Sequence, residues 1–270
     1  MASAGPGRRG DGSRPGADRE LAWLTPVDIA EYLETDKRVI LPFGATENNG
    51  PHLPLATDSV VAEAVAYMAA ARTGVLVCPT VSIGNSSVNM AFPGTISLAP
   101  PTCESVITDV CRSLRLHGFE QVAIVTGHYG NVWPVANVAE TVRDDLGMTV
   151  VQLDVWRCVE QACRDLAVTR MFPFGHGGEM MTSILLHLAP EHVREDRFAV
   201  WAPRDGVELK YYRTYPGRMG YASWHDVTAS GAVGDVSAAS AERGEVALQR
   251  VSDLLVELLE DLPLFSRENA

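Results

Sequence analysis

The stretch RVILPFGATENNGPHLPLATD, residues 38–58, joins an apolar run to a polar loop. The residues that follow Arg38 up to Gly44 are apolar and partly β-branched, which is typical of a strand buried on both faces of a parallel sheet. The next fourteen residues place Glu47, Asn49, His52 and Asp58 among a glycine and prolines. The sequence therefore predicts a buried strand that delivers a stiff, chemically active loop to one edge of a sheet.

The rest of the chain repeats this alternation of strand and helix. Apolar runs predict strands at 38–44, 75–83, 121–127 and 148–156, and helical patterns occur at 21–36, 59–73, 103–118, 131–147 and 242–262. Strands that alternate with helices of this length favour right-handed βαβ units. We expect an α/β fold, a three-layer α/β/α arrangement with a mostly parallel central sheet. Residues 200–235 are less regular and predict a long excursion over the sheet edge or a subunit boundary.

Composition limits the classes of function. The 270 residues carry a net charge of −12, and Lys and Arg total only 22, so we expect no nucleic-acid partner. Residues 1–20 are rich in Gly, Arg, Ser and Pro and predict a disordered leader before a single domain at 21–265. The sequence has no apolar run long enough to span a membrane. Five cysteines without a CxxC pair suit free thiols in a reducing cytoplasm.

Three polar groups of residues follow predicted strands or open a helix. The first is the loop with Glu47 and Asp58, the second is the turn 127–131 (GHYGN), and the third is 176–179 (HGGE). In parallel α/β sheets, ligands bind at the carboxyl ends of the strands, where these groups fall. Taken singly, each has a structural explanation: a turn, a histidine with satisfied hydrogen bonds, or a helix N-terminus that favours Glu179. Taken together, Glu, Asp and His form a common ligand set for a divalent metal ion.

Other catalytic routes lack their signatures. The sequence contains no GxSxG nucleophile elbow, no P-loop and no GxGxxG after a strand. Metal-assisted hydrolysis is therefore the chemistry that the pattern favours, because a bound ion acidifies water and polarises a carbonyl.

Five segments in order resemble the creatininase family of metal-dependent amidohydrolases. They are LPFGATENNGPHLPLATD (41–58), FPGTISL (92–98), IVTGHYGN (124–131), GHGGEMMTSILLHLAPEHVR (175–194) and SGAVGDVSAASAERG (230–244). The resemblance implies an α/β fold, often assembled as a homohexamer. It also implies hydrolysis of a non-peptide or cyclic amide C–N bond of a small molecule at a site with one or two Zn, Mn or Fe ions.

The resemblance also implies roles for particular residues. Glu47, Asp58 and His128 match the ligands of one metal ion. His176 matches a histidine that can carry a proton to the leaving nitrogen, and Glu179 is a second candidate for that general acid. His52 matches the second histidine of the first motif, which is not usually a ligand.

Departures from the family pattern concern the second metal. Asn49 stands where the family has a ligand histidine, and Asn89 stands where another histidine is usual. Met181 replaces a glutamate, and Glu179 is two residues earlier, which puts it on another face of the helix. Gly130 offers no carboxylate either. We therefore expect one divalent metal per chain.

The substrate is expected to meet a small set of side chains around this site. The set is Asn49, His52, Asn89, Tyr129 and Trp156. Two other functions remain open: altered chemistry in a biosynthetic pathway, such as ring opening, dehydration or isomerisation, and a non-catalytic binding subunit. Metal content separates hydrolysis from both.

Overall fold

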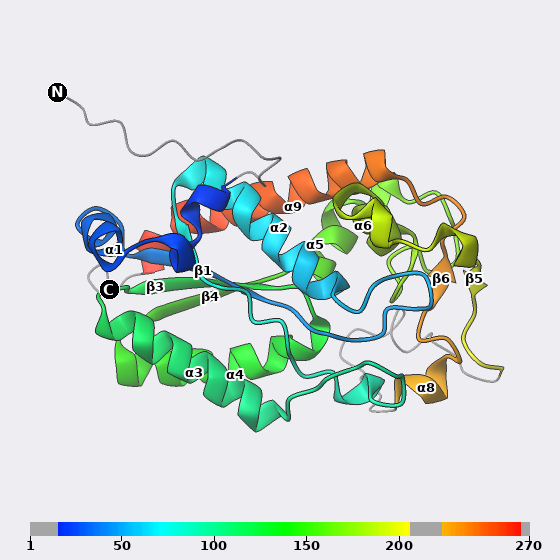
Figure 1. Cartoon of the computed structure of the whole chain (residues 1–270), viewed down its shortest axis with the longest axis horizontal. Coiled ribbons are helices and arrows are strands. Elements are labelled where there is room, and N and C mark those ends of the chain that lie inside the picture. Colours follow the sequence, from blue (N-terminus) through cyan, green and yellow to red (C-terminus); the bar gives the residue numbers. More distant parts are fainter. Residues whose placement is uncertain (1–15, 206–222, 266–270) are drawn as a thin grey trace.

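A parallel sheet of four strands lies at the centre of the computed structural model, which describes residues 16–205 and 223–265 (Figure 1). The strands stand in the order β2-β1-β3-β4. They are β1 (Arg38–Phe43), β2 (Leu76–Val77), β3 (Gln121–Thr126) and β4 (Thr149–Asp154). The predicted parallel sheet is confirmed, since β1 pairs in parallel with β2 and β3, and β3 pairs in parallel with β4.

Helices cover both faces of this sheet (Figure 1). One face carries α2 (Thr57–Thr73), α5 (Val155–Ala162), α6 (Glu179–Leu188) and α9 (Ala241–Asp261). The other carries α1 (Pro26–Leu33), α3 (Pro100–Leu116) and α4 (Val132–Leu146). The predicted three-layer arrangement is therefore confirmed.

Short 3₁₀ turns connect these elements. They are η1 (Ala17–Arg19), η2 (Leu21–Trp23), η3 (Ser87–Asn89), η4 (Tyr129–Asn131), η5 (Arg164–Leu166), η6 (Pro190–His192), η7 (Glu195–Arg197) and η8 (Leu262–Phe265).

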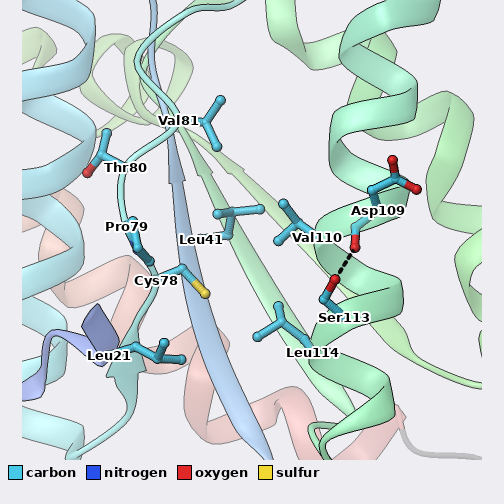
Figure 2. A pocket seen from close by; sticks show the side chains of 10 residues that line it. All are labelled: Leu21, Leu41, Cys78, Pro79, Thr80, Val81, Asp109, Val110, Ser113 and Leu114. Carbon is cyan, nitrogen blue, oxygen red and sulfur yellow. Dashed lines mark hydrogen bonds between the residues drawn. The ribbon is translucent and has the colours of Figure 1, made fainter. Parts of the chain in front are cut away.

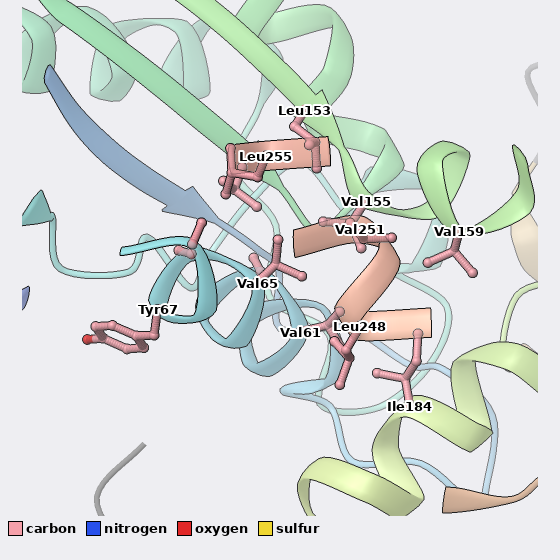
Figure 3. Close-up of a cluster of buried hydrophobic side chains, with 14 of the residues drawn as sticks. Val61, Val65, Tyr67, Leu153, Val155, Val159, Ile184, Leu248, Val251 and Leu255 are labelled. Carbon is pink, nitrogen blue, oxygen red and sulfur yellow. The ribbon is translucent and has the colours of Figure 1, made fainter. Parts of the chain in front are cut away.

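Alternate residues of the strands feed two separate cores. In β1, Val39, Leu41 and Phe43 enter the core under α3 and α4, whereas Ile40 enters the core under α2 and α9. Figure 3 shows the second core, where α2 and α9 meet Leu153 of β4 and Ile184 of α6. A strand that is apolar on both faces is stable only between two helical layers, which explains the apolar runs of β1 and β3.

The strand order creates a topological switch point between β1 and β3. From β1 the chain moves outward to β2, and it then returns across the sheet through α3 to form β3 on the other side of β1. The loops that leave β1 and β3 therefore diverge, and such a topological switch point is where ligands bind in α/β sheets. The loop of Glu47 and the turn of His128 both begin there.

Two predicted strands are shorter than the sequence pattern indicated. The predicted strand 75–83 pairs only at Leu76–Val77, because Pro79 has no N–H to donate; beyond it a single bridge joins Phe43 and Val81. The strand predicted at 148–156 ends at Asp154, whose side chain accepts a hydrogen bond from the Arg157 N–H and caps α5.

The N-terminal region also departs from expectation. Residues 16–20, which were predicted to belong to a disordered leader, form η1 and a bridge between Glu20 and Val77. The rest of the leader, 1–15, lies outside the described residues. The predicted helix 21–36 shortens to α1, where Thr25 and Asp28 cap the first turn reciprocally and Pro26 occupies its start.

The excursion at 200–235 contains β5 (Val200–Trp201), α8 (Trp224–Val227) and β6 (Gly234–Asp235), with β5 and β6 antiparallel. Its residues 206–222 lie outside the described part. Within the described ranges, no helix has the length and apolar character that a membrane span requires.

A hollow of about 460 Å³ lies on the α3 side of the sheet. Figure 2 shows Leu41, Cys78, Val110 and Leu114 among its lining residues. The lining includes none of the predicted site residues.

Candidate metal centre

Glu47, Asp58 and His128 come together at the switch point. Glu47 lies in the loop after β1, Asp58 lies in the first turn of α2, and His128 follows β3 after Gly127. All three are buried, and their ligand atoms lie within 4.8 Å of one another. The structure thus brings together the three residues that were predicted to hold a metal ion.

The ring of His128 is oriented for metal binding. Its Nε2 lies 2.8 Å from the carbonyl oxygen of Asn85, which can only accept a hydrogen bond, so Nε2 carries a proton. Its Nδ1 faces the carboxylates, 3.3 Å from Glu47 Oε1 and 3.2 Å from Asp58 Oδ2. A carbonyl that fixes the tautomer in this way is the usual outer partner of a metal-binding histidine.

The turn that carries His128 is held from both sides. The indole N–H of Trp156 donates to the Gly127 carbonyl at 2.6 Å. A Cβ at Gly127 would lie 2.1 Å from the Asp58 carbonyl oxygen, so only glycine lets α2 approach this closely. A Cβ at Gly130 would lie 2.1 Å from the Asn85 carbonyl oxygen and 2.5 Å from His128 Nε2. The loop of Asn85 therefore fills the space that a side chain at position 130 would need.

Glu47 receives two further contacts. Asn89 Nδ2 donates to Glu47 Oε2 at 2.7 Å, and His176 Nε2 lies 3.0 Å from Glu47 Oε1. His176 Nδ1 donates to the Gly231 carbonyl oxygen at 2.6 Å. Because Nδ1 already carries a proton, the contact between His176 Nε2 and Glu47 requires a second proton that the two groups share.

Burial and charge attraction shift the pKa values of Glu47, His128 and His176 in opposite directions. Burial alone would raise the pKa of Glu47, but His128 and His176 outweigh it and hold that pKa well below its usual range. Burial would lower the pKa of His128 and of His176, but the carboxylates raise both above the ordinary value. Burial raises the pKa of Asp58. Glu47 and the two histidines thus favour one another's charged forms.

The residues present fit a divalent metal. Ligands in a tetrahedral site with bonds of about 2.0–2.2 Å lie roughly 3.3 Å apart, which is the separation of His128 Nδ1 from both carboxylate oxygens. Asp58 Oδ1 is buried and lacks a hydrogen-bond partner among the described residues, although a buried carboxylate normally has one. Two carboxylates and one imidazole suit Zn, Mn or Fe(II).

The predicted substrate-binding residues occupy different environments. Asn49 is fully buried, with Nδ2 3.4 Å from the Glu47 carbonyl, and Asn89 touches the Glu47 carboxylate. Tyr129 is 42% exposed and accepts a hydrogen bond from Arg157. Trp156 supports the His128 turn, as described above.

His52 is also fully buried. Its Nε2 lies 3.0 Å from Thr182 Oγ1 of α6, and its ring packs edge-on against Phe198 and is stacked near Trp201. In this position it joins the loop after β1 to α6.

Glu179 begins α6, and its carboxylate binds elsewhere. It accepts hydrogen bonds from Val168 N–H and from both the N–H and the hydroxyl of Thr169, and it lies 3.4 Å from Arg243. Among the described residues, the structure gives its carboxylate no contact with Glu47, Asp58 or His128. Met181 Sδ accepts from the Gly177 N–H at 3.3 Å.

Sequence reasoning missed two partners of the cluster. The carbonyl oxygens of Asn85 and Gly231 orient His128 and His176, but a backbone carbonyl has no side-chain signature. The only signal in the sequence is position: Asn85 and Gly231 lie in or near the segments that resemble the family.

Buried carboxylates and an oriented imidazole at a topological switch point form a candidate site for a divalent metal ion in an α/β fold. A sequence model of the family described as creatinine amidohydrolase matches residues 22–259. The chain belongs to the creatininase family.

Individual relatives agree with this assignment. Creatinine amidohydrolase from Pseudomonas putida is 28% identical over 248 residues, which cover 85% of this chain and 90% of that protein. The mycofactocin precursor peptide peptidase of Mycolicibacterium smegmatis is 31% identical over 216 residues, covering 77% and 78%. A solved structure described as creatininase with Mn superposes with a TM-score of 0.79 at 26% identity, covering 91% of this chain and 99% of that one.

Proposed function

We propose that this chain is an amidohydrolase that cleaves a non-peptide or cyclic amide C–N bond of a small molecule, using one divalent ion held by Glu47, Asp58 and His128. The observation that carries the proposal is the buried cluster of these ligand atoms, with His176 touching it from a second loop. The bound ion would polarise the carbonyl of the amide and activate water.

His176 is the residue best placed to move a proton. Its Nε2 shares a proton with Glu47 Oε1 while Nδ1 is fixed on the Gly231 carbonyl, so the ring can release and regain a proton only at Nε2. Hydrolysis of an amide requires one proton on the leaving nitrogen, and we assign its delivery to His176 Nε2. We assign to Glu179 the task of holding the 168–169 segment, since its carboxylate is engaged there.

A single ion is supported by what surrounds the ligands. Gly130 has no room for a side chain, Met181 binds a backbone N–H, and Asn89 directs its amide N–H at Glu47. A neutral amide is a poor ligand for Zn, and a thioether favours soft metals.

A peptide-like amide is the second candidate substrate. The peptidase relative named above acts on a precursor peptide, as its name states. In this chain Val88 and Met90 flank Asn89 and are 43% and 55% exposed. Exposed apolar side chains beside a residue that touches Glu47 suit a larger, partly apolar substrate.

The first experiment measures bound metal per chain in protein purified without chelator, with Asp58→Ala as control. We expect about one equivalent, lost in the control. A panel of small amides, lactams and short peptides is then assayed with and without added Zn or Mn. Two equivalents would contradict the single ion. Failure to bind metal even after incubation with Zn or Mn would overturn the hydrolytic proposal and favour altered chemistry or a binding subunit.

We also propose that the chain forms a homo-oligomer, a hexamer by resemblance to its family, and that it acts in the cytoplasm.

A further inference from the structure

Three buried acceptor oxygens beside the metal ligands lack donors. They are Asp58 Oδ1, Asn49 Oδ1 and Asn89 Oδ1, and none has a hydrogen-bond partner among the described residues. The three side chains are 1%, 0% and 3% exposed. Buried polar atoms in native proteins are normally paired, so three such oxygens around one cluster indicate that a ligand supplies the missing donors.

The asparagines cannot turn to satisfy themselves. Asn89 already directs its amide N–H at Glu47 Oε2, and Asn49 directs its amide N–H at the Glu47 carbonyl. In each amide, therefore, the oxygen is the atom left without a partner among the described residues. Flipping either amide would place an oxygen against an oxygen of Glu47.

The number of unpartnered acceptors favours an ammonium group over a donor with fewer N–H groups. One divalent ion balances the two negative charges of ionised Glu47 and Asp58, and the amide oxygens add the negative ends of two dipoles. A primary ammonium carries three N–H donors on one atom, which matches three acceptors. Hydrogen bonds from a charged donor are also roughly twice as strong as neutral ones.

We propose that Asp58 Oδ1, Asn49 Oδ1 and Asn89 Oδ1 bind a primary ammonium group of the substrate beside the single metal ion. This inference rests on the proposed hydrolysis and names the substrate class: an amide with a nearby amino group. In an α-amino amide the nitrogen is two bonds from the carbonyl carbon, so one small molecule reaches both the ion and the acceptors.

Binding of matched amides tests this inference. Alaninamide, mostly protonated at its amine at pH 7, is compared with propanamide, which lacks the amine. Calorimetric titration of zinc-loaded protein is expected to show alaninamide binding at least about tenfold more tightly. Metal content is measured on the same samples, so loss of the ion, which would undermine the proposed hydrolysis, is distinguished from loss of ammonium recognition.

Two substitutions at one position sharpen the test. Asn49→Leu and Asn49→Asp both lose the amide N–H, but only the leucine loses the oxygen. We expect Asn49→Leu to abolish most of the preference for alaninamide and Asn49→Asp to keep or increase it. Ser252→Ala is the control, because it removes another buried, unpartnered polar atom, in α9. It should leave the preference unchanged.

Several results would overturn the inference. They are equal binding of the two amides, detectable binding of neither, a preference that survives Asn49→Leu, and uptake of a second equivalent of Mn by the wild-type chain. The last result would show that the three oxygens are ligands of a second cation.

Discussion

Charged side chains at the two ends of the central sheet differ in how completely they are hydrogen-bonded. At the amino end, Asp36 and Arg38 form a paired contact in which Arg38 Nε lies 2.9 Å from Asp36 Oδ1 and Nη2 lies 2.7 Å from Oδ2. The remaining Arg38 nitrogen donates to the Leu259 carbonyl. At the carboxyl end, His128 Nδ1 lies between Glu47 Oε1 and Asp58 Oδ2, and Asp58 Oδ1 has no hydrogen-bond partner among the described residues.

Unpartnered buried atoms distinguish a candidate ligand site from a structural ion pair. Fully partnered groups have no free bonding capacity, whereas incompletely partnered buried groups retain it for a ligand. Volume gives no such distinction: a hollow of about 660 Å³ lies at the amino end beside Asp36 and Arg38, and its lining includes no predicted site residue.

The largest expected effect is on metal affinity. Asp58→Asn removes a ligand charge, and we expect affinity for Zn to fall by more than about 100-fold, since even outer partners of metal ligands contribute 10–100-fold. Competition with a chromophoric chelator measures it. Asp36→Asn, the matched change at the amino end, should leave affinity unaltered. An equal loss in both variants would erase the proposed contrast between the two ends.

The next effect concerns stability near the site. Glu179→Ala leaves the N–H groups of Val168 and Thr169 without their buried acceptor and Arg243 without its buried counter-charge, while the Thr169 hydroxyl keeps the Asp235 carbonyl at 3.3 Å. We expect the free energy of unfolding to fall by about 3 kcal/mol, measured by urea denaturation of metal-free protein. Glu179→Gln retains one acceptor oxygen and should cost less. If Glu179→Ala were as stable as wild type but inactive, Glu179 would act in catalysis instead.

Burial of His52 should make the free energy of unfolding depend on pH. Burial lowers its pKa from 6.5 to about 4. The unfolded chain therefore binds a proton that the folded chain excludes, so stability is full above pH 6.5 and falls as pH decreases towards 4. The loss from this residue is up to about 3 kcal/mol. His52→Gln should flatten this part of the unfolding profile, whereas exposed His192→Gln should not. Parallel profiles for wild type and His52→Gln would contradict it.

The smallest expected effect is the loss of stability on replacing Asp36, at the amino end of the sheet. Burial raises the pKa of Asp36, but Arg38 outweighs it and the net pKa is lowered. Asp36 therefore stabilises the fold above its ordinary pKa, and this stabilisation disappears as pH falls through the lowered value. Asp36→Asn should cost only about 1 kcal/mol at pH 7 because the pair is partly solvated. A loss as large as that of Glu179→Ala would show that both ends depend equally on their charges.

Much of the sheet and of the metal cluster could be predicted from sequence. Apolar runs at β1 and β3 mark strands covered on both faces, and polar residues directly after them must meet at the switch point. The limits of β2 and β4 could not be predicted by apolar content alone, because Pro79 and the cap by Asp154 end pairing inside apolar runs.

The sequence also could not show which side chains and backbone groups, far apart along the chain, would become hydrogen-bond partners. Glu179 looks like an acid beside a histidine, but its carboxylate turns to the backbone of Val168 and Thr169. His52 lies in a polar motif, yet Thr182, Phe198 and Trp201 enclose it. Only the packed fold determines the hydrogen-bond and ring partners of these polar groups.

The hydrogen bond from Trp156 to Gly127 couples a fluorescent side chain to the candidate metal centre. The indole of Trp156 donates to the carbonyl of the residue that immediately precedes His128. Any movement of that turn when an ion or substrate binds alters the surroundings of this fluorophore. Intrinsic fluorescence therefore offers a dye-free record of occupancy, and Trp156→Phe identifies the part of the signal that arises at this site.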